Sequence, residues 1–463
     1  MLVAGIDSST QSTKVLLCDA ADGTVIGQAS APHPDGTECD PARWWDALDE
    51  AGRGLLDRAD AIGVAAQQHG MIVLDEAGDV IRPALLWNDL RSAAAARDLI
   101  EEMGGPAWWA RETGSVPTAS FTVTKLRWLA AHEPAAAARV DRVLLPHDWL
   151  TWRLADRACE PATDRGDASG TGYFSPAAGE WLPGLAAAAL GAPVRLPRLA
   201  GPAAIVGQTP GGAALSAGTG DNMGAALGLG LGTADDGTVV VSIGTSGTAY
   251  AVSATPAADE SGAVAGFADA TGHFLPLIAT VNASRVLTAT AALLGVDIAT
   301  FDRLALEARP GAGGLTLLPY LDGERTPNRP AASGVLRGLT STNATPANLA
   351  RAAVEAVLCS LADAIDHLTA CGITARQVTL IGGAARSPAV RAIAPAVFGL
   401  PVSVPAPAEY VALGAARQAA WARSGALPDW PVTSAAAPDP AEPEAAVRDR
   451  YAELREATAG WRG

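Results

Sequence analysis

Residues 2–19 read LVAGIDSSTQSTKVLLCD, and this stretch decides how the rest of the chain is interpreted. Two apolar runs, 2–6 and 15–18, flank a polar run rich in hydroxyl groups. Apolar runs separated in this way predict neighbouring strands of a hairpin. The polar tip, 7–13, offers a carboxylate, hydroxyls and backbone amides, which together could hold phosphate oxygens and a hydrated metal ion. A plain polar hairpin tip in solvent fits the same residues.

The same pattern recurs at the start of the second half of the chain. An apolar run over 238–243 leads into the hydroxyl-rich turn 244–248, and a second apolar run covers 249–252. Two such turns, one in each domain, could face each other across a cleft and hold phosphates from both sides. The recurrence favours this paired device over two independent polar turns.

Two predicted strands end in polar side chains. The apolar run 62–66 is followed by Gln68 and His69, and the run 83–87 leads to Asp89. Polar groups at strand ends indicate the rim of a cleft in an α/β protein. A single histidine after a strand is equally compatible with a structural role.

Glycine-bearing turns supply further candidates. Asp221 and Asn222 lie between glycines, which allow the backbone to approach a ligand closely. The turn 382–388 follows a predicted strand, and its Ser387 begins a helix whose amide end attracts anions. The acidic segment 164–170 fits either a loop at the same rim or a plain turn.

Capping signals predict where helices begin. Asp40 and Thr345 are polar N-caps, and each is followed by a proline suited to the first helical position. Further helices are expected over 125–131 and 411–421, and a short one near the end of the chain.

Length and composition limit the class of protein. The 463 residues suggest two domains and a tail, with a hinge at 233–237. The net charge of −16 argues against a nucleic acid or an anionic membrane as partner. The five cysteines show no paired spacing, and no apolar run reaches membrane length, so a cytoplasmic protein is expected. No glycine precedes a lysine, which excludes a P-loop.

Taken together, the segments resemble the FGGY family of sugar kinases in the actin-like ATPase superfamily, and within it the xylulokinases. The matching segments, in unbroken order, are GIDSSTQSTKVLL, DPARWW, QQHGMIVLD with RPALLWND, TGDNMGA, SIGTSG, LPYLDGERTP and IGGAARS. The resemblance implies an α/β fold of two actin-like ATPase (ribonuclease H-like) domains around a central cleft. Residues 1–232 would form the sugar-binding domain and 233–425 the nucleotide-binding domain, with a Pro/Ala linker and a short helix in 426–463.

The resemblance also implies roles for single residues. Asp7 would hold Mg²⁺ and act in catalysis, and Asp221 would accept the proton of the sugar hydroxyl. An ordinary aspartate pKa of about 3.9 would leave Asp221 ionised. The sugar would contact Gln68, His69, Asp221 and Asn222. The implied contacts with ATP are Thr10, Ser12, Lys14, Thr245, Gly383, Ala384 and Ser387.

The implied reaction transfers the γ-phosphoryl group of ATP to a primary hydroxyl of a pentulose, converting D-xylulose to D-xylulose 5-phosphate. Gln68 stands where many xylulokinases have methionine, so ribulose, another ketose or a polyol such as arabitol stays open as the acceptor. Ser9 stands where many relatives have glycine, so a looser approach of the backbone to a phosphate is expected in the first turn. An actin-like switch that hydrolyses ATP without a sugar is the alternative from another class. A homodimer is compatible with the sequence, which does not settle the oligomeric state.

Overall fold

The structure is a computed structural model, and it describes residues 1–232, 236–436, 438 and 441–461. The contacts divide the chain into two compact units. Unit 1 comprises Met1–Ala234, Val252–Pro276 and Ala408–Val432, and unit 2 comprises Asp235–Ala251, Leu277–Pro407 and Thr433–Gly463. The predicted hinge lies partly outside the described residues, because these omit 233–235.

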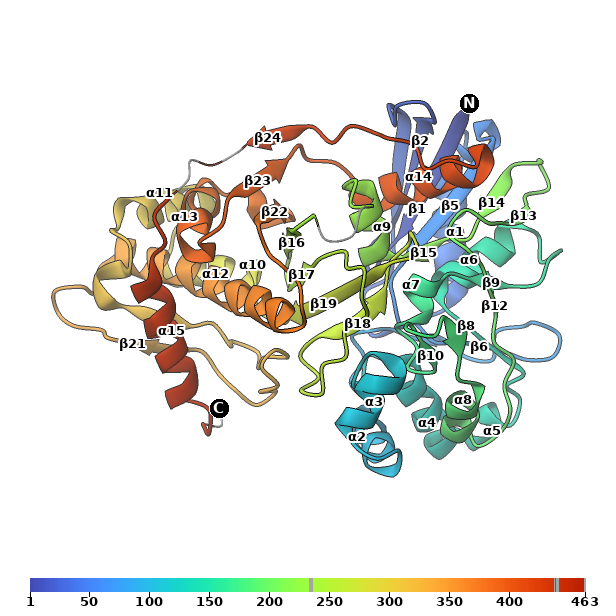
Figure 1. Cartoon of the computed structure of the whole chain (residues 1–463), viewed down its shortest axis with the longest axis horizontal. Coiled ribbons are helices and arrows are strands. Elements are labelled where there is room, and N and C mark those ends of the chain that lie inside the picture. Colours follow the sequence, from blue (N-terminus) through green and yellow to red (C-terminus); the bar gives the residue numbers. More distant parts are fainter. Residues whose placement is uncertain (233–235, 437, 439–440, 462–463) are drawn as a thin grey trace. The chain divides into compact units, whose positions relative to one another are not determined.

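A mixed sheet forms the centre of unit 1, with the strand order β13-β14-β5-β1-β2-β3 and β15 also paired with β5 (Figure 1). Its strands are β1 (Leu2–Ser8), β2 (Ser12–Asp19), β3 (Val25–Pro32), β5 (Ala61–Ala66), β13 (Ile205–Gln208), β14 (Ala214–Ser216) and β15 (Thr219–Gly220). β1 pairs antiparallel with β2 and parallel with β5, which confirms the predicted hairpin. The register places Asp7 opposite Lys14 and Ser8 opposite Thr13, so the connecting tip is shorter than the polar run.

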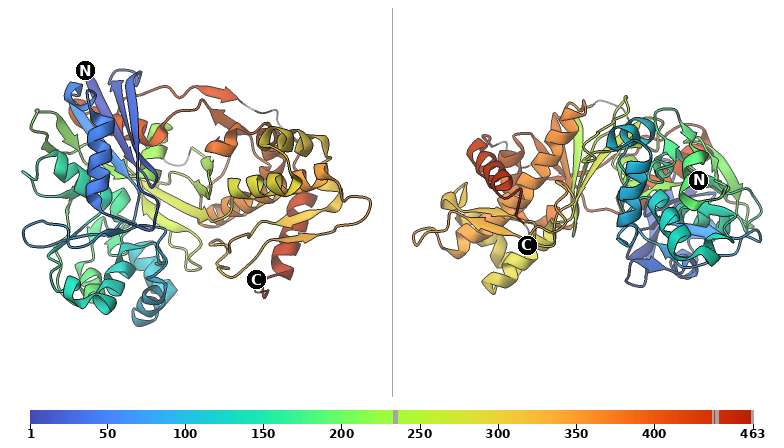
Figure 2. Two further views of the ribbon diagram at one scale, coloured as in Figure 1. Left: turned by 180° about the vertical axis from the view of Figure 1, so that it is seen from behind. Right: turned by 90° about the horizontal axis from the view of Figure 1, so that it is seen from below.

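Two helices cover opposite faces of this sheet (Figures 1 and 2). They are α1 (Pro41–Gly52), the blue helix in the left view of Figure 2, and α14 (Tyr410–Ser424). Side chains alternate along β1, so Ile6 belongs to the same buried apolar cluster as Trp44 of α1, while Val3 belongs to the cluster that includes Ala412 of α14. As predicted, α1 follows the N-cap Asp40, whose side chain accepts a hydrogen bond from a backbone amide.

α14 approaches the sheet at backbone contact distance. A Cβ atom on Gly5 would lie 1.8 Å from the carbonyl oxygen of Ala412. One on Gly63 would lie 2.1 Å from the carbonyl oxygen of Ala415. Glycine is therefore required at these strand positions, because any side chain would push α14 off the sheet.

The remaining elements of unit 1 surround this framework. The helices are α2 (Ala93–Glu102), α3 (Pro106–Thr113), α4 (Thr122–His132), α5 (Pro134–Ala137), α6 (Pro146–Leu154), α7 (Arg165–Ala168), α8 (Pro183–Leu190) and α9 (Asp221–Gly228). The short strands are β4 (Glu38–Cys39), β6 (Ile72–Leu74), β7 (Ala84–Leu85), β8 (Arg142–Leu144), β9 (Ala162–Thr163), β10 (Phe174–Ser175), β11 (Glu180–Trp181), β12 (Arg198–Leu199) and β18 (Ala265–Ala268).

Two of these helices differ from the sequence interpretation. α4 begins at Thr122, three residues before the predicted start, because its buried first turn overrides the weak helix propensity of threonine and valine. The segment 164–170 contains the short helix α7, since the Asp164 side chain accepts hydrogen bonds from the amides of Gly166 and Asp167.

The sheet of unit 2 repeats the arrangement around the first hairpin. Its strands follow the order β19-β17-β16-β22-β23-β24, formed by β19 (Phe274–Thr280), β17 (Gly247–Tyr250), β16 (Thr238–Ile243), β22 (Gln377–Ile381), β23 (Val402–Pro405) and β24 (Ser434–Ala436). β16 pairs antiparallel with β17 and parallel with β22, as β1 does with β2 and β5. The predicted recurrence of the hairpin is therefore confirmed.

Helices complete unit 2: α10 (Ser284–Leu294), α11 (Ile298–Glu307), α12 (Pro346–Ala370), α13 (Pro388–Phe398) and α15 (Ala445–Ala457). Thr345 caps α12 by accepting a hydrogen bond from the amide of Asn348, as its sequence predicts. A two-stranded sheet of β20 (Thr316–Leu318) and β21 (Val335–Arg337) accompanies them. In the described part of the chain no single helix has the length and apolarity to cross a membrane, and only the bent pair α10 and α11 meets those two criteria jointly.

Candidate active site

Asp7 lies at the end of β1 and is almost fully buried. Its carboxylate accepts a hydrogen bond from the Ser9 hydroxyl, and Lys14 Nζ lies 4.0 Å from its Oδ2. The same Nζ lies 2.5 Å from Oε2 of Glu409, at the start of α14. Burial raises the pKa of Asp7 to about 6, although Ser9 and Lys14 oppose this shift. The first turn thus presents a buried carboxylate whose charge is only partly balanced.

The side chains of this turn suit a magnesium ion bound together with phosphate. Among the described residues, no three His, Cys, Asp or Glu side chains converge as a metal cluster. Mg²⁺ is commonly held by one or two carboxylates together with phosphate oxygens and water. A cation beside Asp7 would offset the desolvation that raises its pKa. Asp7 therefore fits such an ion.

Two other predicted residues lie on the same hairpin. Thr10 is at the tip, where its Oγ1 accepts a hydrogen bond of 2.8 Å from Nε1 of Trp87. Ser12 begins β2 and is half-buried. The contact with Trp87 links the first turn to the segment that follows β7. No pattern in the sequence around either residue predicts this contact.

Asp221 is the first residue of α9, directly after the end of β15. Its Oδ1 accepts hydrogen bonds from the backbone amide of Asn222, at 2.8 Å, and from Asn222 Nδ2, at 3.0 Å. The residue as a whole is half-buried. Burial, followed by the negative charges of Asp7 and Asp167, raises the pKa of Asp221 to about 7. The expectation of an ordinary aspartate pKa is therefore wrong, because the neighbouring carboxylates come from distant parts of the chain.

Gln418 of α14 holds the loop that leads to Asp221. Its Oε1 accepts hydrogen bonds from the Gly218 amide, at 2.8 Å, and from the Ser216 hydroxyl, at 3.0 Å. Its Nε2 donates to the Gly218 carbonyl oxygen at 3.0 Å. The helix that packs directly on β1 and β5 thus also fixes the approach to Asp221. Sequence reasoning missed Gln418, since its partners lie far away in the chain.

The predicted sugar residues of unit 1 lie together. Gln68 follows β5, and its Oε1 accepts a hydrogen bond of 3.3 Å from Asn222 Nδ2, the atom that also contacts Asp221. Gln68 Nε2 is buried and has no hydrogen-bond partner among the described residues, which leaves a donor for a ligand. The His69 ring is fixed by a contact of 2.6 Å between its Nδ1 and the carbonyl oxygen of Gly170.

A buried acidic network supports α7 beside Asp221. His147 Nδ1 lies 2.6 Å from Asp167 Oδ2, and the Thr219 hydroxyl donates to Asp164 Oδ2 at 2.8 Å. Burial alone would lower the pKa of His147, but Asp148 and Asp167 outweigh it and raise the value to about 9. The network ties α7 to β15, whose end carries Asp221. Sequence reasoning left the segment 164–170 open and gave His147 no role.

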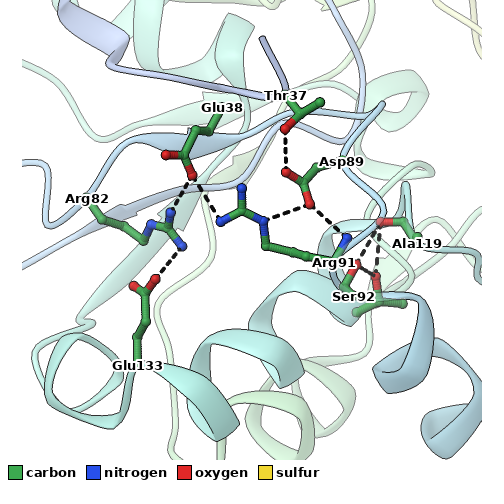
Figure 3. Close-up of polar contacts among 9 residues, drawn as sticks. Thr37, Glu38, Arg82, Asp89, Arg91, Ser92, Ala119 and Glu133 are labelled. Atoms are coloured by element: carbon green, nitrogen blue, oxygen red, sulfur yellow. Dashed lines mark hydrogen bonds and ion pairs between the residues drawn. The ribbon is translucent and has the colours of Figure 1, made fainter.

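Asp89, which was expected at the rim of a cleft, takes part in a network of ion pairs and hydrogen bonds (Figure 3). Its Oδ1 accepts from Arg91 Nε at 2.8 Å, and its Oδ2 accepts from the Thr37 hydroxyl at 2.8 Å. Glu38 Oε2 in turn lies 3.0 Å from Arg91 Nη1 and 2.9 Å from Arg82 Nη2. These contacts lock the segment after β7 in place, so Asp89 has a structural role.

The predicted nucleotide residues of unit 2 lie at one edge of its sheet. Thr245 is exposed in the turn between β16 and β17, and Gly383 and Ala384 follow β22. β16 and β22 are paired in parallel, with Ser242 opposite Ile381, so their following turns are neighbours. Ser387 caps α13 by accepting from the amide of Val390 at 3.1 Å, and it donates to Asp302 Oδ1 at 2.5 Å.

Comparison with known proteins gives one consistent family. Residues 2–230 match the model of the N-terminal domain of the FGGY family of carbohydrate kinases, and residues 239–423 match that of its C-terminal domain. A xylulose kinase of Streptomyces coelicolor is 48% identical over 92% of this chain and 88% of its own. A xylulose kinase of Escherichia coli is 36% identical over 83% of this chain and 82% of its own.

Solved structures agree with this result. The crystal structure of a xylulose kinase from Bifidobacterium adolescentis superposes with a TM-score of 0.91 at 42% identity, covering 98% of this chain and 99% of that one. The predicted two-domain α/β fold and the predicted sugar-kinase class are thereby confirmed. The chain belongs to the FGGY family of carbohydrate kinases.

Proposed function

We propose that this kinase transfers the γ-phosphoryl group of ATP to a primary hydroxyl of D-xylulose, giving D-xylulose 5-phosphate. The observation that carries the proposal is the connected group of Asp221, Asn222 and Gln68. In this group a carboxylate with a raised pKa lies near a buried amide donor that has no partner in the described part of the chain. The xylulose kinases to which the chain is similar support the choice of sugar.

In this proposal Asp221 accepts the proton of the attacking hydroxyl. A pKa of about 7 suits a general base at neutral pH, because about half of the groups are then ionised and the carboxylate is more basic than an ordinary aspartate. Gln68, His69 and Asn222 orient the sugar. Phosphoryl transfer has a loose transition state, so positioning and charge neutralisation supply most of the rate.

The nucleotide residues keep the roles expected from the family. Thr10, Ser12, Lys14 and Thr245 are proposed to contact phosphates, and Gly383, Ala384 and Ser387 the adenosine. Asp7 would hold Mg²⁺, whose charge neutralises the β- and γ-phosphates when it is bound. Lys14 is already paired with Glu409, so contact with a phosphate would require it to exchange partners.

The proposal is tested by measuring ADP release with ATP and a panel of D-xylulose, D-ribulose, D-arabitol and no sugar. D-Xylulose should give the highest kcat/KM, and ATP turnover without sugar should remain at background. A higher value for ribulose or arabitol would replace the proposed substrate while leaving the kinase class intact. ATP turnover indifferent to sugar would instead favour the actin-like switch.

Replacing His69 by alanine should raise the KM for the sugar about 5- to 50-fold and leave the KM for ATP within about twofold, because the imidazole is proposed to contact the sugar and not the nucleotide. Steady-state kinetics with each substrate varied in turn measure both constants. His132→Ala is the matched control, since this exposed histidine contacts Trp128 on the surface of α4. Equal changes in both constants would assign His69 to the scaffold.

A further inference from the structure

Lys125 is one of only two lysines in the chain, and its side chain is completely buried. It lies in the first turn of α4, and its Nζ donates a hydrogen bond of 2.7 Å to the backbone carbonyl oxygen of His69. A fully buried lysine is rare, because removing an ammonium from water is costly. A lysine buried at this position is therefore expected to have a specific structural or functional role.

The residue that Lys125 holds has an unusual backbone. His69 has a φ of 67°, in the left-handed region that residues other than glycine seldom adopt. Such a conformation persists only where the surroundings fix it. The carbonyl oxygen of His69 accepts a second hydrogen bond of 3.2 Å, from the Thr122 hydroxyl, so two donors from one turn of α4 hold it.

The ring of His69 is fixed as firmly as its backbone. Its Nδ1 contacts the carbonyl oxygen of Gly170, and the rings of Phe121 and Phe267 lie 4.9 and 5.9 Å from the imidazole, centre to centre. Gln68, which contacts Asn222, is the preceding residue. The backbone conformation at His69 consequently sets the direction of two side chains proposed to bind the sugar.

Lys125 is aimed at this carbonyl and not at an acid. Among the described residues, no carboxylate oxygen forms an ion pair with Nζ. Asp89 is close enough to stabilise the ammonium, but Arg91 and Thr37 already occupy its two oxygens (Figure 3). Burial lowers the pKa of Lys125 well below its usual range, and Asp89 opposes this. Either charge state of the amine can donate to His69.

We propose that Lys125 is a positioning residue for the phosphoryl acceptor. Together with Thr122, it holds His69 and the preceding Gln68 in the backbone conformation that sugar binding requires. Without the amine, the left-handed turn relaxes, and both side chains lose their orientation toward the sugar. The inference rests on the proposed function, since it assigns Lys125 to the sugar site.

The test uses Lys125→Met in the full-length enzyme, since methionine keeps the length and apolar body of the side chain but has no donor. The KM values for D-xylulose and ATP are measured, together with the Kd of D-xylulose by calorimetry without nucleotide. The sugar constants should rise about 10- to 100-fold, while the KM for ATP changes less than about twofold. Arg127→Met, two positions along α4 and paired with Glu102 near the surface, is the matched control and should leave the sugar constants unchanged.

Thr122→Val provides a second, milder variant of the same shape. It removes the longer of the two hydrogen bonds to His69 and should raise the sugar KM about 2- to 5-fold. If Lys125→Met fails to fold, the sugar KM of Thr122→Val is the deciding measurement. A sugar KM above the wild-type value supports the proposal, and an unchanged sugar KM overturns it.

The other outcomes separate the inference from the proposed function. A wild-type enzyme that phosphorylates no pentulose would overturn the proposed function. If the wild type is active and Lys125→Met keeps its sugar constants while its melting temperature falls, Lys125 is only structural and the inference is wrong. Equal rises in the KM for sugar and for ATP would also overturn it.

Discussion

Asp221→Ala should lower kcat about 10²- to 10⁴-fold, the usual effect of removing a positioned proton acceptor, while the KM for ATP stays within about twofold. The carboxylate lies at the first position of α9, held through Asn222 and the loop fixed by Gln418, so its loss should leave the fold intact. Steady-state kinetics with D-xylulose and ATP measure the effect. A variant that phosphorylates sugar at near the wild-type rate would remove Asp221 from the role of base.

Asp46→Ala is the control for this experiment, because Asp46 is exposed on α1 and forms a surface ion pair with Arg43. The pH profile of the wild type offers an independent check. Because burial and neighbouring carboxylates raise the pKa of Asp221 to about 7, the base becomes protonated below that pH, and kcat/KM for the sugar should fall about tenfold per pH unit there. A profile that stays flat down to about pH 5 would contradict this assignment.

Gly63→Ala should lower the free energy of unfolding by about 3 kcal/mol or more, or prevent folding altogether. The added Cβ would lie 2.1 Å from the carbonyl oxygen of Ala415 and 2.9 Å from its carbonyl carbon. These are backbone atoms of α14, so no side-chain rotation can relieve the overlap. Urea-induced unfolding followed by circular dichroism measures the loss.

Gly184→Ala is the matched control, because a Cβ there meets nothing within 4 Å and the residue lies inside α8. It should leave stability unchanged or raise it by about 0.5–1 kcal/mol, since alanine is the better helix former. If Gly63→Ala unfolded at the same urea concentration as this control, the close packing of α14 on β5 would be refuted.

The elements that sequence predicted correctly are those whose signal is local. Both hairpins consist of apolar runs around a polar turn, and the helices after Asp40 and Thr345 carry their caps and prolines in consecutive positions. Motifs also selected Gln68, Asn222 and Asp221, which the structure brings together.

The features that sequence reasoning missed arise from tertiary contacts. The pKa of Asp221 depends on Asp7 and Asp167, and neither the burial nor these neighbours can be inferred from the residues around position 221. The burial of Lys125 had one indication in the sequence, because lysine is rare in this chain and the neighbours of Lys125 in α4 are mostly apolar. Its partner, the carbonyl of His69, belongs to a turn that no local pattern connects with α4.

The place of α14 has a consequence for how the protein is made. β1 and β5 are synthesised well before the helix that covers one of their faces, because that helix lies in Ala408–Val432, after most of unit 2 in the chain. During translation, Val3, Leu16 and Ala61 therefore lack the partners that bury them in the finished protein. The nascent chain therefore exposes one apolar face of this sheet until residues 408–432 have been synthesised, and such exposed surface favours aggregation during synthesis.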